Sequence, residues 1–181
     1  KEQKSAKLVM IGDSAVGKSS ILLRLINNDF SQQQAVTLNA SFMNYIIATK
    51  KGQQQLAIWD TAGQERFQSL SQIYFRNADI AVIVIDINKD DCLQSAQKYI
   101  QQVKQKAMNP YVTIVIAANK ADISHWKIDQ QKLEEFSSIQ NVRCVICSAK
   151  SGENIQRLFE IAAESLNMEE NQHNPQQILK Q

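Results

Sequence analysis

Short apolar runs recur along the chain, separated by longer segments in which apolar residues repeat at helical spacing. The runs are rich in β-branched residues, and several contain almost no polar position. That pattern is typical of strands buried on both faces of a mostly parallel sheet. A more mixed stretch at 41–50 indicates an edge strand that turns at Lys51-Gly52 into the next strand. The buried runs predict strands at 7–12, 56–60, 80–86, 112–119 and 142–148.

Helical patterns occupy the segments between these strands, at 18–27, 92–108, 129–138 and 153–167. Alternation of strands and helices predicts an α/β domain, with a doubly wound, mostly parallel six-stranded sheet and helices on both faces. In such sheets ligands bind beyond the carboxyl ends of the strands. The loops at those ends are therefore expected to carry the chemistry.

The pattern divides the chain into one domain with short ends. Residues 1–6 form a polar N-terminal extension, 7–167 form the domain, and 168–181 lack a sustained period and predict a flexible tail. A domain of this length can bury a single core. No apolar run approaches the roughly 20 residues that cross a bilayer, and the first residues lack the apolar core of a signal peptide.

Composition and charge change this picture little. With 20 basic and 18 acidic residues the formal net charge is +2, too balanced to indicate a nucleic-acid surface. Three cysteines make no disulfide framework in a domain of this length. Cys144 and Cys147 lie three positions apart in a predicted strand, so they point to opposite faces and predict no metal site. We expect a reduced, cytoplasmic monomer with no nucleic-acid partner.

The first predicted strand runs directly into GDSAVGKSS at 12–20, and a helical pattern follows. The spacing G-x-x-x-x-G-K-S is that of a loop whose backbone N–H groups surround nucleotide phosphates at a helix N-terminus. Within it, Lys18 is expected to reach the β- and γ-phosphates, and the Ser19 hydroxyl to ligate Mg²⁺. The motif predicts phosphate binding but does not identify the base. The other predicted nucleotide contacts in the loop are Asp13, Ser14, Ala15, Val16, Gly17 and Ser20.

A second group of candidates follows the strand that ends in DTAGQE. Asp60, at the carboxyl end of that strand, can hold Mg²⁺ through a water molecule. Gly63 can bring its N–H to the γ-phosphate, and Gln64 can orient an attacking water as the catalytic residue. Thr37 lies in the polar segment QQQAVTLNA and, taken alone, is only a loop threonine.

The base is indicated by NKAD, which follows another buried strand. The Asn119 amide can pair with a purine edge. The Asp122 carboxylate can accept two N–H donors, which guanine offers through N1–H and its 2-amino group and adenine does not. Facing adenine, the carboxylate would stay unpaired at a cost of about 1–3 kcal/mol. Ser148, Ala149 and Lys150 form a second loop beside the base, and together the motifs predict guanine.

With GDSAVGKS, Thr37, WDTAGQE, NKAD and SAK all in order, the chain closely resembles the Ras-like small GTPases over about 7–167. The resemblance implies that Phe30 packs against the guanine, that Lys120 lies along the base and that Ala149 gives it a backbone contact.

The same resemblance implies two switch segments, 30–42 and 61–76. Thr37 would close over Mg²⁺ and the γ-phosphate in the GTP state. GTP/GDP and Mg²⁺ would be the cofactors, and hydrolysis would be slow without a GTPase-activating protein. Two alternatives stay open: a scaffold that binds nucleotide without cycling, and a P-loop enzyme that acts on a nucleotide or small substrate.

Within this superfamily the chain looks like a Rab, because LAIWDTAGQERF is a Rab-type run. Phe42, Trp59 and Tyr74 match the aromatic triad through which Rabs contact effectors. From its position in a strand alone, Trp59 could equally be a core residue. The stretch TLNASF is most similar to the endosomal branch, with Asn39 where Rabs usually carry glycine. A Rab of a secretory route is the alternative.

A Rab identity implies partners: effectors, an exchange factor, a GTPase-activating protein and a GDP-dissociation inhibitor. Rabs normally carry prenylated cysteines after a flexible tail, and this sequence has no cysteine after Cys147. We therefore expect membrane attachment through a C-terminal lipid absent from this chain. The protein would be cytoplasmic and cycle onto the cytosolic face of endosomal or vesicle membranes. His125 and Trp126 are expected in an exposed loop after NKAD.

Overall fold

The computed structural model describes residues 5–30, 41–60 and 76–172. In these ranges six strands form one sheet in the order β2-β3-β1-β4-β5-β6. All neighbouring strands are parallel except β2 and β3, which are antiparallel, with β2 at the edge as predicted. The strands are β1 (Ala6–Ile11), β2 (Ser41–Thr49), β3 (Gly52–Asp60), β4 (Ile80–Asp86), β5 (Thr113–Asn119) and β6 (Arg143–Ile146).

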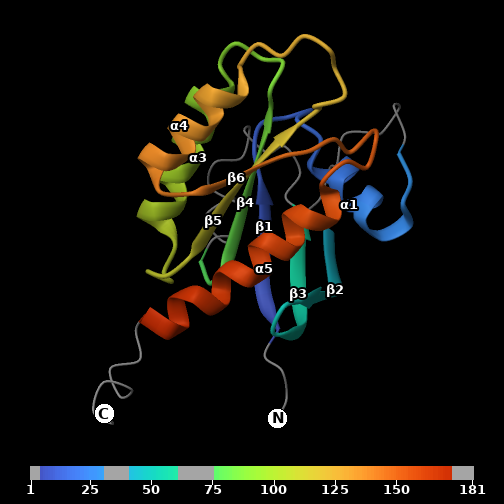
Figure 1. The fold of residues 1–181 in the computed structure, drawn as a ribbon. Helices are drawn as coiled ribbons and strands as arrows, with labels where there is room; N and C mark the ends of the chain where they lie inside the picture. Colours follow the sequence, from blue (N-terminus) through green and yellow to red (C-terminus); the bar gives the residue numbers. More distant parts are fainter. Residues whose placement is uncertain (1–4, 31–40, 61–75, 173–181) are drawn as a thin grey trace.

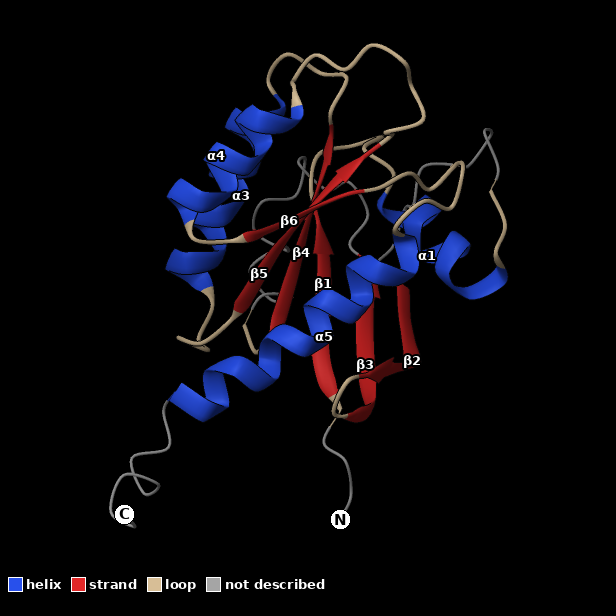
Figure 2. Cartoon of the chain, in the orientation of Figure 1, coloured by secondary structure: helices blue, strands red, loops and turns tan. Residues whose placement is uncertain are grey.

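Helices cover both faces of the sheet (Figures 1 and 2). The helices in the described ranges are α1 (Lys18–Asn27), α3 (Cys92–Lys106), α4 (Gln130–Gln140) and α5 (Ile155–Gln172). Helices α1 and α5 pack into one core cluster, and α3 and α4 into a second cluster on the opposite face. The predicted doubly wound α/β fold is confirmed.

The continuous apolar runs follow from this two-sided burial. Along β1, Leu8 and Met10 belong to the first cluster, whereas Val9 and Ile11 belong to the second. Successive strand side chains point to opposite faces, so a strand covered on both sides favours an apolar side chain at every position. In β4 all seven residues are buried, and only Asp86 at its end is polar.

The two cysteines of the C-x-x-C sequence also lie on opposite faces of the sheet. Cys147 lies in the first cluster and Cys144 packs against the second. Burial raises the pKa of the Cys144 thiol to about 12 and also raises the pKa of Cys147. Among the described residues no three or more His, Cys, Asp or Glu side chains are grouped so as to hold a metal ion.

Two local expectations differ from the structure. Helix α5 continues to Gln172, five residues into the predicted tail, because no glycine or proline interrupts the chain before Pro175. Trp126 is half-buried against the second cluster, and its Nε1 donates to the Ala121 carbonyl at 3.2 Å. The loop is therefore exposed at His125 but not at Trp126. No helix in the described ranges is long and apolar enough to span a membrane.

Candidate functional site

The phosphate-binding loop leaves the carboxyl end of β1 and leads into α1, as the motif requires. Gly12 has φ +146°, and a Cβ there would lie 2.3 Å from the Val84 carbonyl oxygen of β4. Gly17 has φ +101°, and a Cβ there would lie 2.4 Å from Asn119 Nδ2. Only glycine fits either position, because the loop passes so close to neighbouring backbone and side chain. Ala15 also has a positive φ, of 61°.

Lys18 lies inside this loop and is only 5% exposed. Its Nζ donates to the Gly12 carbonyl at 2.8 Å and to the Asp13 carbonyl at 2.7 Å. These two bonds fix the ammonium group at the loop, where its charge complements that of a phosphate. Whether Lys18 reaches the β- and γ-phosphates stays a prediction. Of the remaining predicted contacts, Ser14 and Val16 lie in the loop between β1 and α1, and Ser20 lies in the first turn of α1.

The structure brings together Ser19 and Asp60, the two described residues that the sequence proposes as metal ligands. Ser19 Oγ donates to Asp60 Oδ2 at 2.5 Å, which brings the first turn of α1 to the end of β3. Asp60 is 2% exposed, and burial raises the pKa of its carboxyl against the opposing effects of Ser19 and Lys18. Its Oδ1 is buried without a hydrogen-bond partner among the described residues.

This orphan oxygen tests whether the residues fit Mg²⁺. A buried carboxylate oxygen without a partner is costly, and a water bound to a metal ion would supply the missing donor. The Ser19 hydroxyl, whose hydrogen is directed to Asp60, keeps oxygen lone pairs for a cation. Mg²⁺ prefers such oxygen ligands and usually retains several waters. Ser19 and Asp60 therefore fit the ion.

Asn119 joins the phosphate-binding loop to the loop that follows β6. The residue is 1% exposed at the end of β5. Its Nδ2 donates to the Val16 carbonyl at 2.8 Å, and its Oδ1 accepts from the Ala149 N–H at 3.1 Å. Both ends of the Asn119 amide are thus hydrogen-bonded. Asn119, predicted to bind the base, also connects the phosphate-binding loop to the loop after β6.

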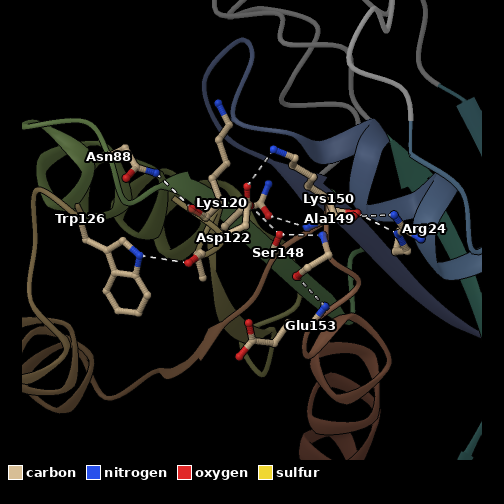
Figure 3. Close-up of polar contacts among 12 residues, drawn as sticks. Arg24, Asn88, Lys120, Asp122, Trp126, Ser148, Ala149, Lys150 and Glu153 are labelled. Atoms are coloured by element: carbon tan, nitrogen blue, oxygen red, sulfur yellow. Dashed lines mark hydrogen bonds and ion pairs between the residues drawn. The ribbon is translucent and has the colours of Figure 1, made fainter. Parts of the chain in front are cut away.

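Asp122 is oriented by the second loop (Figure 3). Ser148 Oγ donates to Asp122 Oδ1 at 2.6 Å, and Lys150 Nζ lies 3.7 Å from Asp122 Oδ2. The Asp122 side chain is 18% exposed. Because a carboxylate offers about four lone-pair sites, it can still accept the two N–H donors of a guanine edge.

Lys120 has a positive φ of 70°, and its Nζ lies 2.6 Å from Asp86 Oδ2 at the end of β4. Asn88 donates to the other Asp86 oxygen through its backbone and side chain, at 3.0 and 3.2 Å. Burial would raise the pKa of Asp86, but these donors outweigh it and hold that pKa below the usual value. Asp86 was not predicted, although an acid ending a wholly apolar strand is a signal for a buried partner.

Arg24, on α1, is a second residue that the sequence did not indicate. Its Nε donates to the Ala149 carbonyl at 2.8 Å and its Nη2 to the Lys150 carbonyl at 2.6 Å (Figure 3). Its Nη1 donates to the Asn28 carbonyl at 2.7 Å. The guanidinium fork therefore ties the second base loop to the helix that carries the phosphate-binding loop.

Phe42 and Trp59 are register partners on β2 and β3, with ring centroids 4.9 Å apart. Phe42 is 51% exposed, whereas Trp59 packs against the second core cluster. Phe30 is half-buried against the first cluster. Four predicted residues lie outside the described ranges: Thr37, Gly63, Gln64 and Tyr74.

Comparisons with known proteins agree with this arrangement. The Ras family model matches residues 7–168. Ras-related protein Rab-5B of Plasmodium falciparum is 41% identical over 155 residues, which cover 85% of this chain and 74% of that protein. GTP-binding protein ypt5 of Schizosaccharomyces pombe is 36% identical over 167 residues, which cover 91% of this chain and 79% of that protein. The family match spans every residue of the site described above.

Proposed function

Because the chain belongs to the Ras family of small GTPases, and within it to the Rabs, we propose that it is a molecular switch that recruits effectors in endosomal membrane traffic. It binds guanine nucleotides and hydrolyses GTP to GDP and phosphate. The observation that carries the proposal is the Asp122 carboxylate, which Ser148 orients in the loop after β5. A carboxylate there favours guanine over adenine because only guanine offers two donors to it.

The residues of the site have separate roles in this proposal. Lys18 places its charge on the phosphates, and the glycines let the backbone N–H groups turn towards them. Ser19 and Asp60 would hold Mg²⁺, Asp60 through a water, and Thr37 would join them in the GTP state. When bound, the ion neutralises charge on the phosphate oxygens.

Gln64 is proposed to orient the attacking water, and Gly63 to donate its N–H to the γ-phosphate. The sequence has no arginine in 12–20 or 30–42 that would stabilise transition-state charge in cis. We therefore expect slow intrinsic turnover, on the order of 10⁻⁴ to 10⁻² s⁻¹, which a GTPase-activating protein accelerates.

The proposed effector surface consists of Phe42, Trp59 and Tyr74. Support comes from the exposed Phe42 ring against Trp59 on adjacent strands. An exchange factor and a GDP-dissociation inhibitor would complete the cycle. The similarity to Rab-5B and ypt5 supports the endosomal route over a secretory one.

The first test combines identification of the bound nucleotide with hydrolysis rates. Nucleotide extracted from the purified protein should be GDP or GTP. In single-turnover assays, Gln64→Leu should hydrolyse GTP at least about fivefold more slowly than wild type, because the water is no longer oriented.

Gln131→Leu, which changes a glutamine on the surface of α4, is the matched control and should leave the rate unchanged. Equal rates for Gln64→Leu and wild type would contradict the role of Gln64. Adenine nucleotide in the extract would overturn the base assignment. Bound GDP without any GTP turnover, even with a cognate activator, would instead indicate a scaffold that does not cycle.

A further inference from the structure

Asp13 places a carboxylate in the loop that binds phosphates, where like charges repel. The structure holds this side chain from α3. Ser95 Oγ donates to Asp13 Oδ2 at 2.5 Å, and the Tyr99 hydroxyl donates to Asp13 Oδ1 at 2.9 Å. Both carboxylate oxygens of Asp13 therefore accept hydrogen bonds from α3. The two donor residues lie 82 and 86 positions further along the chain.

The two donors are themselves held in place by packing. Tyr99 is 8% exposed and belongs to the second core cluster, together with Ala96 and Ile100 of the same helix. Its ring cannot move without disturbing that cluster, so the hydroxyl has a defined position. Burial would raise the pKa of Asp13, but Ser95 and Tyr99, with nearby lysines, hold it below the usual value.

The same residue also supports the phosphate-binding lysine. The Asp13 carbonyl accepts from Lys18 Nζ at 2.7 Å. Fixing the Asp13 side chain therefore also fixes the carbonyl that helps to hold the ammonium. A chain of contacts thus runs from α3 through Asp13 to Lys18, although neither Ser95 nor Tyr99 belongs to the phosphate motif.

We propose that Ser95 and Tyr99 are positioning residues that act through Asp13 to keep the phosphate-binding loop and Lys18 in place, and so slow the release of GDP. Without the two hydroxyls, the Asp13 carboxylate is able to turn towards the Lys18 ammonium and compete with the phosphate for it. This inference rests on the proposed nucleotide site and assigns part of its control to α3.

The experiment measures release of a fluorescent GDP analogue from Tyr99→Phe, Ser95→Ala and the double variant, with Mg²⁺ present. Each single variant should release GDP about three- to tenfold faster, because each loses a hydrogen bond to a charged group. Tyr45→Phe and Ser137→Ala are the matched controls, since they remove exposed hydroxyls outside the site and should leave release unchanged.

Two further readouts separate positioning from general loosening. The ³¹P resonance of the bound β-phosphate should shift in Tyr99→Phe, while the guanine imino proton resonance stays in place. In an Asp13→Ala background, Tyr99→Phe should have no further effect, because the residue through which it acts is missing.

Release within twofold of wild type with an unshifted ³¹P resonance would overturn the inference. A further acceleration of release by Tyr99→Phe in the Asp13→Ala background would also overturn it. Equal shifts of the ³¹P resonance and the guanine imino resonance would do the same. A wild-type protein that binds no guanine nucleotide would instead refute the proposed function itself, so the two failures are distinguishable.

Discussion

The nucleotide site has two halves. The base half consists of Asn119, Asp122 and the loop 148–150, and the phosphate half consists of the loop 12–20 and Asp60. In the base half, Asn119, Asp122 and Ser148 all have protein partners, and Arg24 ties the loop that contains Ser148 to α1. In the phosphate half, Asp60 Oδ1 is buried without a partner in the described part of the chain. Asn88 Oδ1, next to Asp86, is also buried without a partner among the described residues. We infer that protein partners hold the side chains that would bind the base, whereas a metal-bound water would supply the donor that Asp60 Oδ1 lacks.

This difference matches what a switch requires. Guanine is the same in GDP and GTP, so a rigid base half contributes equally to the binding of both. The γ-phosphate is the only group that distinguishes the two nucleotides, and in such switches it orders segments that relax after hydrolysis. We therefore expect base-half variants to change GDP and GTP binding alike, and phosphate-half variants to change them unequally.

The largest expected effect is that of Asp122→Asn. One hydrogen bond to a charged acceptor is lost, at about 1.5–3 kcal/mol, and the new amide N–H faces the guanine 2-amino group, which leaves a buried donor unpaired at about 1–3 kcal/mol. GDP affinity should therefore fall roughly a hundredfold or more. Equilibrium competition with GDP and with a non-hydrolysable GTP analogue measures the loss, which should be equal for both. Xanthosine diphosphate is the control, because its C2 oxygen accepts from the new amide and should restore binding. If Asp122→Asn kept the wild-type preference for guanine, Asp122 would not be the residue that recognises the base.

Removal of Mg²⁺ should have the next largest effect. Chelation should accelerate GDP release about tenfold or more in wild type, since charge on the phosphates is no longer neutralised. In Asp60→Asn the acceleration should shrink to less than about threefold, because the ion is already weakly held. Asp129→Asn, which retains a good N-cap for α4, is the matched control. Full sensitivity to chelation in Asp60→Asn would exclude Asp60 from the metal site.

Arg24→Lys should give the smallest effect of the three. A lysine cannot reproduce the planar fork that spans the Ala149 and Lys150 carbonyls. Release should be about three- to tenfold faster for GDP and the GTP analogue alike, and chelation should not change that factor. Arg157→Lys, on the exposed side of α5, should leave release unaltered. If the acceleration of release in Arg24→Lys disappeared after chelation of Mg²⁺, Arg24 would act on the phosphate half instead.

The fold could be predicted because two-sided burial leaves a direct trace in the sequence. Runs such as IAVIVID cannot be surface strands, and their alternation with helical patterns determines the sheet class. Element ends were less accurate: β6 is shorter than its apolar run, and α5 is longer than its apolar period. Strand and helix ends depend on local hydrogen bonds that apolar periodicity does not report.

The site was predictable where its chemistry lies in local motifs. Lys18, Ser19 and Asp122 stand at fixed spacings, and in the structure they follow the carboxyl ends of β1 and β5; their roles towards a nucleotide stay predictions. Arg24 and Tyr99 were missed because their partners lie 125 and 86 residues away, beyond any local spacing. The roles of Thr37, Gly63, Gln64 and Tyr74 stay predictions.

The most direct test of the two-halves account compares nucleotide release from Arg24→Lys and Asp60→Asn. Dissociation rates of GDP and of a non-hydrolysable GTP analogue are measured for both variants and wild type with Mg²⁺ present. The account predicts that Arg24→Lys keeps the ratio of the two rates within about twofold of wild type. It predicts that Asp60→Asn changes that ratio about fivefold or more, because a bound Mg²⁺ would neutralise more charge on GTP than on GDP. An equal change of ratio in both variants would contradict the division of the site.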